Sequence, residues 1–124
     1  MNIIVSGGKD FNDWNVFKAS LDRLTISWEQ VVIFNCCDGE CDRMARRYAD
    51  KRCRCWDFPV SQFVPFPRSY ELRNMDIVFN ADGAVLFWDG KSPEIGHLIS
   101  VLKLSRRRTV VFDYYGNIMF NLSF

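Results

Sequence analysis

Two glycine-bearing turns carry the residues whose chemistry is easiest to interpret. The first, residues 6–11, places Gly7 and Gly8 directly after an apolar run. Because glycine has no side chain, its backbone approaches a ligand closely, and amides at a following helix start bind phosphate or other anions. Lys9 adds a positive charge beside them. The alternative is a simple tight strand-to-helix turn, since neither a Walker A loop nor a G-x-G-x-x-G spacing is present.

The second turn, residues 89–97, also follows an apolar run and leads into a helix pattern. Ser92 is placed to cap that helix, and Pro93 to occupy its first position. Lys91 and the helix N-terminus then form a second anion site, with a well-capped loop bearing an exposed lysine as an equal alternative. His97 is the sole histidine and no G-x-S-x-G pattern accompanies it. The sequence therefore favours a structural or ligand-contacting histidine over a catalytic one.

Basic residues outside these turns are easier to explain as solvated or ion-paired side chains. Arg73 has the planar group that pairs with a phosphate or carboxylate through two N–H groups, although a surface ion pair is the commoner use of a single arginine. The run at 106–108 follows a helix pattern, where cations suit the helix dipole, and is expected to be a solvated turn.

Five cysteines, an odd number, are present and no secretion signal precedes them. We expect reduced thiols that act as small apolar residues, because a disulfide framework requires an oxidising compartment. A zinc site is the alternative, but the paired C-x-x-C spacing is missing and His97 lies far downstream. The sequence thus predicts neither a metal nor a cofactor.

Composition sets the class of protein. The chain has 124 residues, 48% hydrophobic and 25% charged, which suits one globular domain. A net charge of +1 gives no field that would attract nucleic acid or an anionic membrane. Without a signal peptide or an apolar run of membrane-spanning length, the expected location is the cytoplasm.

Short apolar runs alternate with helix patterns, which indicates a parallel sheet covered by helices. We expect a Rossmann-like three-layer α/β sandwich with about five mostly parallel strands and helices on both faces. The domain should span 1–113, with the tail 114–124 adding an edge strand. Loops at the carboxyl edge of such a sheet bind ligands where the strand order reverses. The expected strands are 2–5, 31–34, 53–58, 83–88 and 109–112, and the expected helices 13–24, 41–51, 70–80 and 94–104.

Four motifs, in collinear order over about residues 1–113, resemble the YspA-like branch of the SLOG superfamily. The stretch IIVSGGKDF at 3–11 resembles the opening VxGGRDF of that family, and DRMA at 42–45 followed by Tyr48-Ala49 is similar to its GADRLAxxYA. The pair at 73–74 matches its RN element. FWDGKS at 87–92, followed by Gly96-His97, is similar to FWDGKSxGTxH.

The resemblance implies a Rossmann-like fold that holds a nucleotide or nucleotide-derived signal at the carboxyl edge of the sheet. Two departures stand out: CCDGECD at 36–42 replaces a glycine-rich GGAxGAD, and the hydrolase motif PGGxGTxxE is absent after the fourth strand. Glu94 is a stand-in for its glutamate at a different spacing, so binding is favoured over hydrolysis. Carried over by position, the ligand site comprises Gly7, Gly8, Lys9, Asp10, Asp42, Arg73, Asn74, Asp89, Gly90, Lys91 and Ser92.

Three functions follow from these patterns, and whether the protein is an enzyme stays open. The first is a module that binds or senses a nucleotide-like ligand, with Lys9, Lys91 and Arg73 neutralising phosphate while Trp88 or Phe11 stacks on a base. The second is a hydrolase of N-glycosidic bonds with an acid or base drawn from Asp10, Asp42, Asp89 or Glu94. The third is an interaction protein that has lost its site, whose aromatic-rich surface would serve a homo-oligomer.

Overall fold

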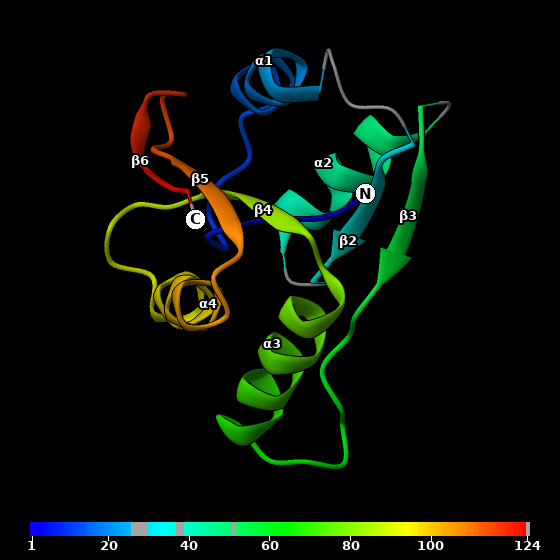
Figure 1. The fold of residues 1–124 in the computed structure, drawn as a ribbon, viewed down its shortest axis with the longest axis vertical. Helices are drawn as coiled ribbons and strands as arrows, with labels where there is room; N and C mark the ends of the chain where they lie inside the picture. Colours follow the sequence, from blue (N-terminus) through cyan, green and yellow to red (C-terminus); the bar gives the residue numbers. More distant parts are fainter. Residues whose placement is uncertain (26–29, 37–38, 51, 124) are drawn as a thin grey trace.

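The computed structural model describes residues 1–25, 30–36, 39–50 and 52–123 (Figure 1). Six strands form one sheet in the order β3-β2-β1-β4-β5-β6. Strands β1 to β5 are parallel, and β6 pairs antiparallel with β5. This order, with β1 and β4 adjacent at its centre, confirms the expected Rossmann-like α/β fold. The strands are β1 (Asn2–Gly7), β2 (Val32–Asn35), β3 (Arg54–Asp57), β4 (Gly83–Phe87), β5 (Arg108–Phe112) and β6 (Ile118–Leu122).

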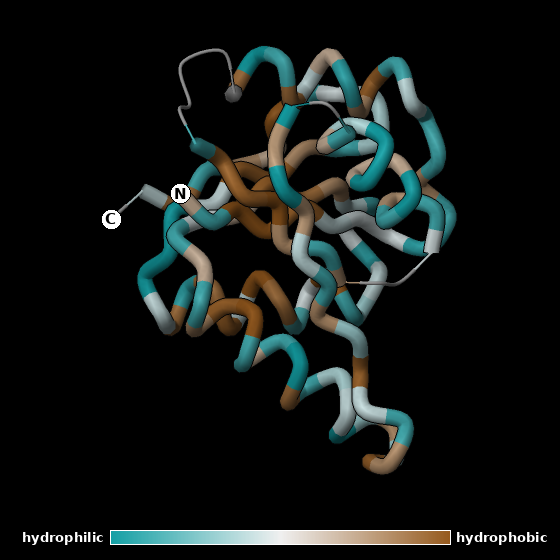
Figure 2. The backbone as a smooth tube through the Cα atoms, turned by 90° about the vertical axis from the view of Figure 1, so that its right-hand side faces the viewer, coloured by the Kyte–Doolittle hydropathy of each residue, from teal (hydrophilic) through white to brown (hydrophobic). Residues whose placement is uncertain are grey.

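Four helices cover the two faces of the sheet in pairs, as expected. They are α1 (Trp14–Thr25), α2 (Glu40–Ala49), α3 (Arg68–Asn80) and α4 (Pro93–Leu104). Alternate residues of the strands point to opposite faces. Val5 and Val85 therefore join the core under α1 and α2, whereas Ile4 and Leu86 join the core under α3 and α4. The hydropathy view places the most apolar backbone in this central layer (Figure 2).

The sequence predicted capping residues for two helices, α1 and α4. Asp13 caps α1, because its Oδ1 accepts the N–H of Val16 at 3.1 Å. Ser92 stands at the N-cap of α4 with Pro93 as the first helical residue, but Ser92 makes no side-chain capping bond. The expected N-cap position is therefore confirmed, but its hydroxyl does not bond to the helix amides, and the Ser92 N–H donates to Asp89 Oδ1 at 2.7 Å.

The tail adds the edge strand that its weak alternation suggested. Strand β6 pairs with β5 from Thr109↔Leu122 to Phe112↔Ile118, with an irregularity between Val111 and Phe112. Asp113, in the connecting turn, accepts the N–H of Tyr115 and of Asn117, both at 2.9 Å. None of the helices in the described ranges is long and apolar enough to cross a membrane.

Candidate functional site

The ends of β1 and β4 bring the two glycine-bearing turns together at the carboxyl edge of the sheet. The Gly8 N–H donates to the carbonyl of Phe87 at 3.1 Å, and residues Asp89 and Gly90 follow directly on β4. The strand order reverses between these two strands, where open α/β sheets bind ligands. The structure thus confirms the juxtaposition on which the sequence hypothesis rested (Figure 1).

The turn after β4 is fixed by one carboxylate. Asp89 Oδ1 accepts the N–H groups of Lys91 at 2.8 Å and Ser92 at 2.7 Å. Gly90, which lies between Asp89 and Lys91, adopts φ +81°, a conformation that favours glycine. The hydrogen bonds from Ser92, and then from Lys91, lower the pKa of Asp89. This turn is therefore held in place by the chain itself, and it presents the Lys91 side chain to solvent.

Tyr114, which follows β5, lies against Gly8. A Cβ atom at Gly8 would sit 1.9 Å from the Tyr114 Oη and 3.1 Å from the Ser92 Oγ, so only glycine fits with the tyrosine in this position. The hydroxyl donates to Asp10 at 3.3 Å. Burial, and then the charges of Asp10 and Asp89, raise the pKa of Tyr114 to about 12. Gly8 therefore has a packing role that the sequence analysis did not foresee.

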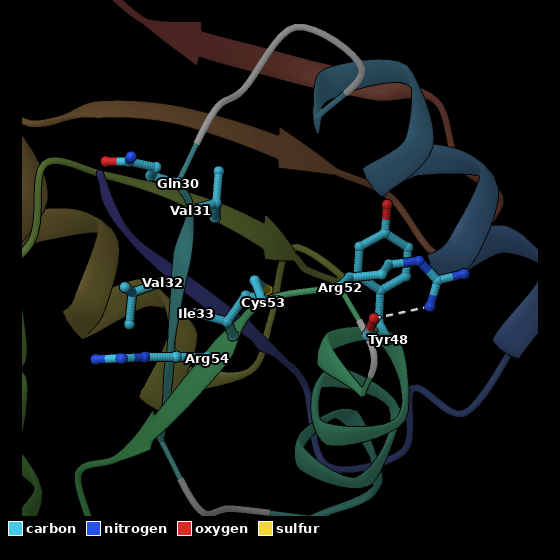
Figure 3. Close-up of a pocket in the computed structure, with 8 residues that line it drawn as sticks. All are labelled: Gln30, Val31, Val32, Ile33, Tyr48, Arg52, Cys53 and Arg54. Carbon is cyan, nitrogen blue, oxygen red and sulfur yellow. Dashed lines mark hydrogen bonds between the residues drawn. The ribbon is translucent and has the colours of Figure 1, made fainter.

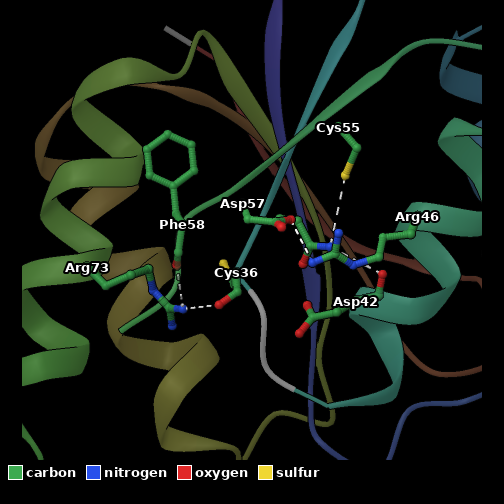
Figure 4. A network of polar contacts seen from close by, with 8 residues as sticks. Cys36, Asp42, Arg46, Cys55, Asp57, Phe58 and Arg73 are labelled. Atoms are coloured by element: carbon green, nitrogen blue, oxygen red, sulfur yellow. Dashed lines mark hydrogen bonds and ion pairs between the residues drawn. The ribbon is translucent and has the colours of Figure 1, made fainter. Parts of the chain in front are cut away.

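Arg73 connects the loops that follow β2 and β3. Its side chain is buried, and Nη1 donates to the carbonyls of Cys36 and, at 3.4 Å, Phe58 (Figure 4). Nε donates to Asn74 Oδ1 at 2.9 Å. Arg73 is thus neither a surface ion pair nor a cation projecting into solvent, because its guanidinium serves main-chain acceptors.

The hydrogen bond from Arg73 sets the orientation of the Asn74 amide, and that amide contacts His97. Because a guanidinium only donates, the Asn74 oxygen must face Arg73 and its amide nitrogen must face the histidine. That nitrogen lies 2.9 Å from His97 Nδ1. Nδ1 therefore accepts, and the neutral ring carries its proton on Nε2. This partly buried hydrogen bond leaves the other ring nitrogen of His97 as a donor.

Two adjoining cavities lie at this edge. The one against Gly8 has a volume of about 10 Å³, room for a single water molecule. Lys9 and Glu94 meet beside it, with Nζ 3.6 Å from Oε1. The second measures about 140 Å³ and is lined by Phe66, Pro67, Tyr70, Glu71, Asn74, Pro93, Glu94 and His97. Asn74 and Glu94 line both cavities.

The family model for the YspA, cpYpsA-related SLOG family matches residues 1–59. This part of the chain is therefore similar to that family. The matched part contains β1 to β3 with α1 and α2. No match was found among curated proteins or among solved structures. The resemblance of the motifs at 73–74, 87–92 and 96–97 falls outside the matched residues and stays a prediction.

Several residues carried over from the SLOG pattern do not line either of the two cavities. Asp42 is buried on α2, where its main-chain carbonyl accepts Asn35 Nδ2 at 3.3 Å. Arg46, one turn along α2, pairs with Asp57 at 2.7 Å (Figure 4). Asp10, Asp89, Gly90, Lys91 and Ser92 belong to the turns beside Gly8 without forming the walls of these cavities. The structure brings together Gly7, Gly8, Lys9, Arg73 and Asn74.

The expected base-stacking residues are used elsewhere. Phe11 is 1% exposed and stacks on Phe87 with ring centroids 4.6 Å apart, so it belongs to the core and the stacking role is wrong for it. Trp88 packs against the core under α3 and α4 and donates Nε1–H to the Ser92 carbonyl at 3.0 Å. Phe66 precedes α3 and Tyr70 lies in its first turn, and both line the larger cavity. Neither was identified from sequence, because their place beside His97 depends on the packing of α3 against α4.

Two of the described cysteines in the stretch that replaces the glycine-rich SLOG loop have structural uses, and of these Cys36 is a buried core residue. Cys41 is fully buried, and a Cβ at Gly7 would lie 3.1 Å from its Sγ, so the thiol fills space that this glycine leaves free. Burial raises the pKa of Cys41 well above its ordinary value. Cys37 and Asp38 lie outside the described residues. Within the described ranges, no group of three or more His, Cys, Asp or Glu side chains is arranged to hold a metal ion.

A larger hollow of about 640 Å³ lies at the opposite edge of the sheet (Figure 3). The starts of β2 and β3 line it together with Tyr48, whose carbonyl accepts Arg52 Nη1 at 2.8 Å. It is remote from Gly7 and Gly8, which stand at the other end of β1. This hollow is therefore not the predicted site.

The two turn carboxylates predict a loss of stability in acid. Hydrogen bonds lower the pKa values of Asp89, chiefly from Ser92, and of Asp113, chiefly from Asn117, below the ordinary 3.8. Because the pKa is lower in the folded state, each carboxylate contributes its full stabilisation at pH values above the ordinary pKa of about 3.8. This contribution is lost as the pH falls through the lowered pKa of the folded state. Urea midpoints measured from neutral to strongly acidic pH should therefore fall more steeply for the wild type than for an Asp89→Asn, Asp113→Asn double variant. Identical acid limbs would contradict the assignment.

Proposed function

We propose that the protein binds a nucleotide or a nucleotide-derived small molecule at the carboxyl edge of β1 and β4. The observation that carries this proposal is the cavity of about 140 Å³, which joins aromatic and polar side chains beside the Gly8 turn. A nucleobase has a flat face for stacking and an edge of donors and acceptors. The volume is below the roughly 300–1,000 Å³ of whole-ligand pockets, which suits a base more than an entire nucleotide.

The lining supplies both kinds of recognition. Phe66 and Tyr70 meet edge to face with centroids 5.4 Å apart, and both rings border the cavity. His97 contributes a ring N–H, and Glu94 a carboxylate acceptor. Because His97 is held by the buried Asn74, its orientation is set before a ligand arrives. Such preorganisation lowers the entropy lost on binding.

A phosphate group would occupy the edge beside Gly8 and the start of α4. The present cavity of about 10 Å³ admits no phosphate while Lys9 faces Glu94. This ion pair has side-chain exposures of 65% and 29%, and pairs near the surface contribute only about 0–1 kcal/mol. Rotation of the two flexible side chains would exchange the Lys9–Glu94 contact for a Lys9–phosphate contact. Lys91, exposed on the adjoining turn, is the second cation.

Ligand-induced thermal stabilisation tests the proposal. A nucleotide at about 100 times its Kd should stabilise the folded protein by about 2.7 kcal/mol, seen as a rise in Tm. A Lys9→Ala, Lys91→Ala double variant should lose most of that rise. The matched control is Lys103→Ala, which removes an exposed lysine from the far end of α4 and should keep the rise.

The second candidate, an interaction protein whose ligand site has closed, is favoured by the small volume against Gly8 and by Tyr114 covering that glycine. The same experiment separates the two. No change in Tm with any member of a broad panel of nucleosides, nucleotides and cyclic nucleotides would reject ligand binding and leave this second candidate.

A further inference from the structure

Helix α3 carries an apolar stripe on the side that faces away from the sheet. Leu72, Met75 and Phe79 are 40%, 54% and 78% exposed, whereas Ile77 and Val78 on the other side are fully buried. The spacing of three and four residues places the exposed three on one helical face. In two views at right angles, α3 and the segment before it project beyond the body of the molecule (Figures 1 and 2). The stripe is therefore open to a partner.

We propose that a second copy of this chain packs antiparallel along this stripe, about a two-fold axis at Leu72. The charges on the helix are self-complementary in that register. Arg68 lies four residues before Leu72 and Asp76 four residues after it, each about 6 Å along the axis. An antiparallel pair therefore places Arg68 of each copy level with Asp76 of the other, as a two-fold interface requires.

Within one chain, Arg68 faces Glu71 at 3.5 Å, with side-chain exposures of 62% and 41%. Exposed pairs of this kind contribute about 0–1 kcal/mol, so Arg68 exchanges or shares its partner at little cost. The face carries one cation, Arg68, and two carboxylates, Glu71 and Asp76, instead of a run of basic side chains. A nucleic acid or an anionic membrane would require a basic face, which leaves a like surface as the better fit.

The same register gives Phe79 an apolar partner. Phe79 lies about 10 Å along the axis from Leu72, so it meets the segment that leads into α3 of the other copy. Phe63 and Phe66 of that segment are 88% and 71% exposed. Aromatic side chains bury about 150–250 Å² each, so the five apolar side chains supply on the order of 500 Å² per copy. The sum over two copies is at the lower end for specific interfaces, which predicts a reversible dimer.

Sedimentation equilibrium of the full chain over a wide concentration series tests this dimer. The average mass should rise with concentration from one chain of 14.6 kDa toward two. Phe79→Ser should weaken association by about tenfold or more, because it removes on both sides of the axis the aromatic contact with Phe63 and Phe66 of the other copy. Leu104→Ser is the matched control, since Leu104 is 86% exposed at the end of α4, away from the stripe.

A charge exchange tests the register. Arg68→Glu and Asp76→Arg should each weaken the dimer, and the double variant should restore it, because the opposed charges return with reversed sign. Far-UV circular dichroism confirms that each variant is folded. A chain that stays monomeric throughout, or a dimer that survives Phe79→Ser, would overturn the proposal. Failure of the double variant to restore association would overturn the antiparallel register centred on Leu72.

Discussion

Replacing Phe87 with alanine is expected to lower the free energy of unfolding by about 3–5 kcal/mol. Phe87 is fully buried at the end of β4, and its ring stacks on Phe11 at 4.6 Å and on Phe112 at 5.5 Å. Phe17 of α1 packs against it at 5.4 Å. Truncation would remove the centre of this aromatic cluster and leave a cavity that its ring neighbours fill only in part.

The loss of packing at Phe87 should also disturb the turn at Gly8 in the candidate site. Phe11 ends the turn that carries Gly8, and the Phe87 carbonyl accepts the Gly8 N–H. Urea denaturation measures the stability change, with Leu104→Ala as the control. Leu104 is 86% exposed at the end of α4, so its truncation should change stability by less than about 0.5 kcal/mol. A Phe87→Ala loss below about 1 kcal/mol would contradict the packing described here.

Arg73→Ala has the second-largest expected effect, a loss of about 3 kcal/mol. Its guanidinium serves the carbonyls of Cys36 and Phe58 and the Asn74 oxygen. Removing the donor leaves these acceptors short of a partner in a buried region, and unpaired buried polar groups are costly. Arg73→Lys should recover part of the loss, since an ammonium reaches some of these acceptors but not all.

The matched control for Arg73 is Arg43→Ala on α2. Arg43 is 81% exposed in its side chain and lies 3.7 Å from Glu40, so its removal should cost less than about 1 kcal/mol. Chemical denaturation and ligand-induced Tm shifts on the same proteins separate the two roles of Arg73. If Arg73→Ala kept full stability while abolishing nucleotide binding, Arg73 would be a ligand cation instead of a structural donor.

Much of the fold was predictable because each strand is a short apolar run that ends in turn residues. Residues 83–87, for example, have no polar side chain, as a strand covered on both faces requires. Helix α1 followed from the spacing of Phe17 and Leu21 and from Asp13 as its cap. The parallel order then followed from the alternation of strands and helices, which places the turns after β1 and β4 at one edge.

The candidate site was predictable in position but not in its walls. Gly8, Lys9 and Arg73 do meet at the expected edge. The burial of Phe11 and the cover that Tyr114 gives Gly8 had no sequence signal, because they depend on contacts between residues far apart in the chain. Phe66 and Tyr70 likewise became candidates through the packing of α3 beside α4.

By itself, the sequence determined the sheet, its helices and the two glycine turns, since local patterns of polarity and backbone freedom set these features. Only the tertiary structure decided which side chains near those turns are available to contact a ligand. Arg73 is drawn inward to main-chain carbonyls, Phe11 joins the core, and His97 is fixed through Asn74. The physical reason is that a buried polar group needs hydrogen-bond partners and a buried ring needs packing neighbours. These partners are distant in the chain, so the order of residues does not specify them.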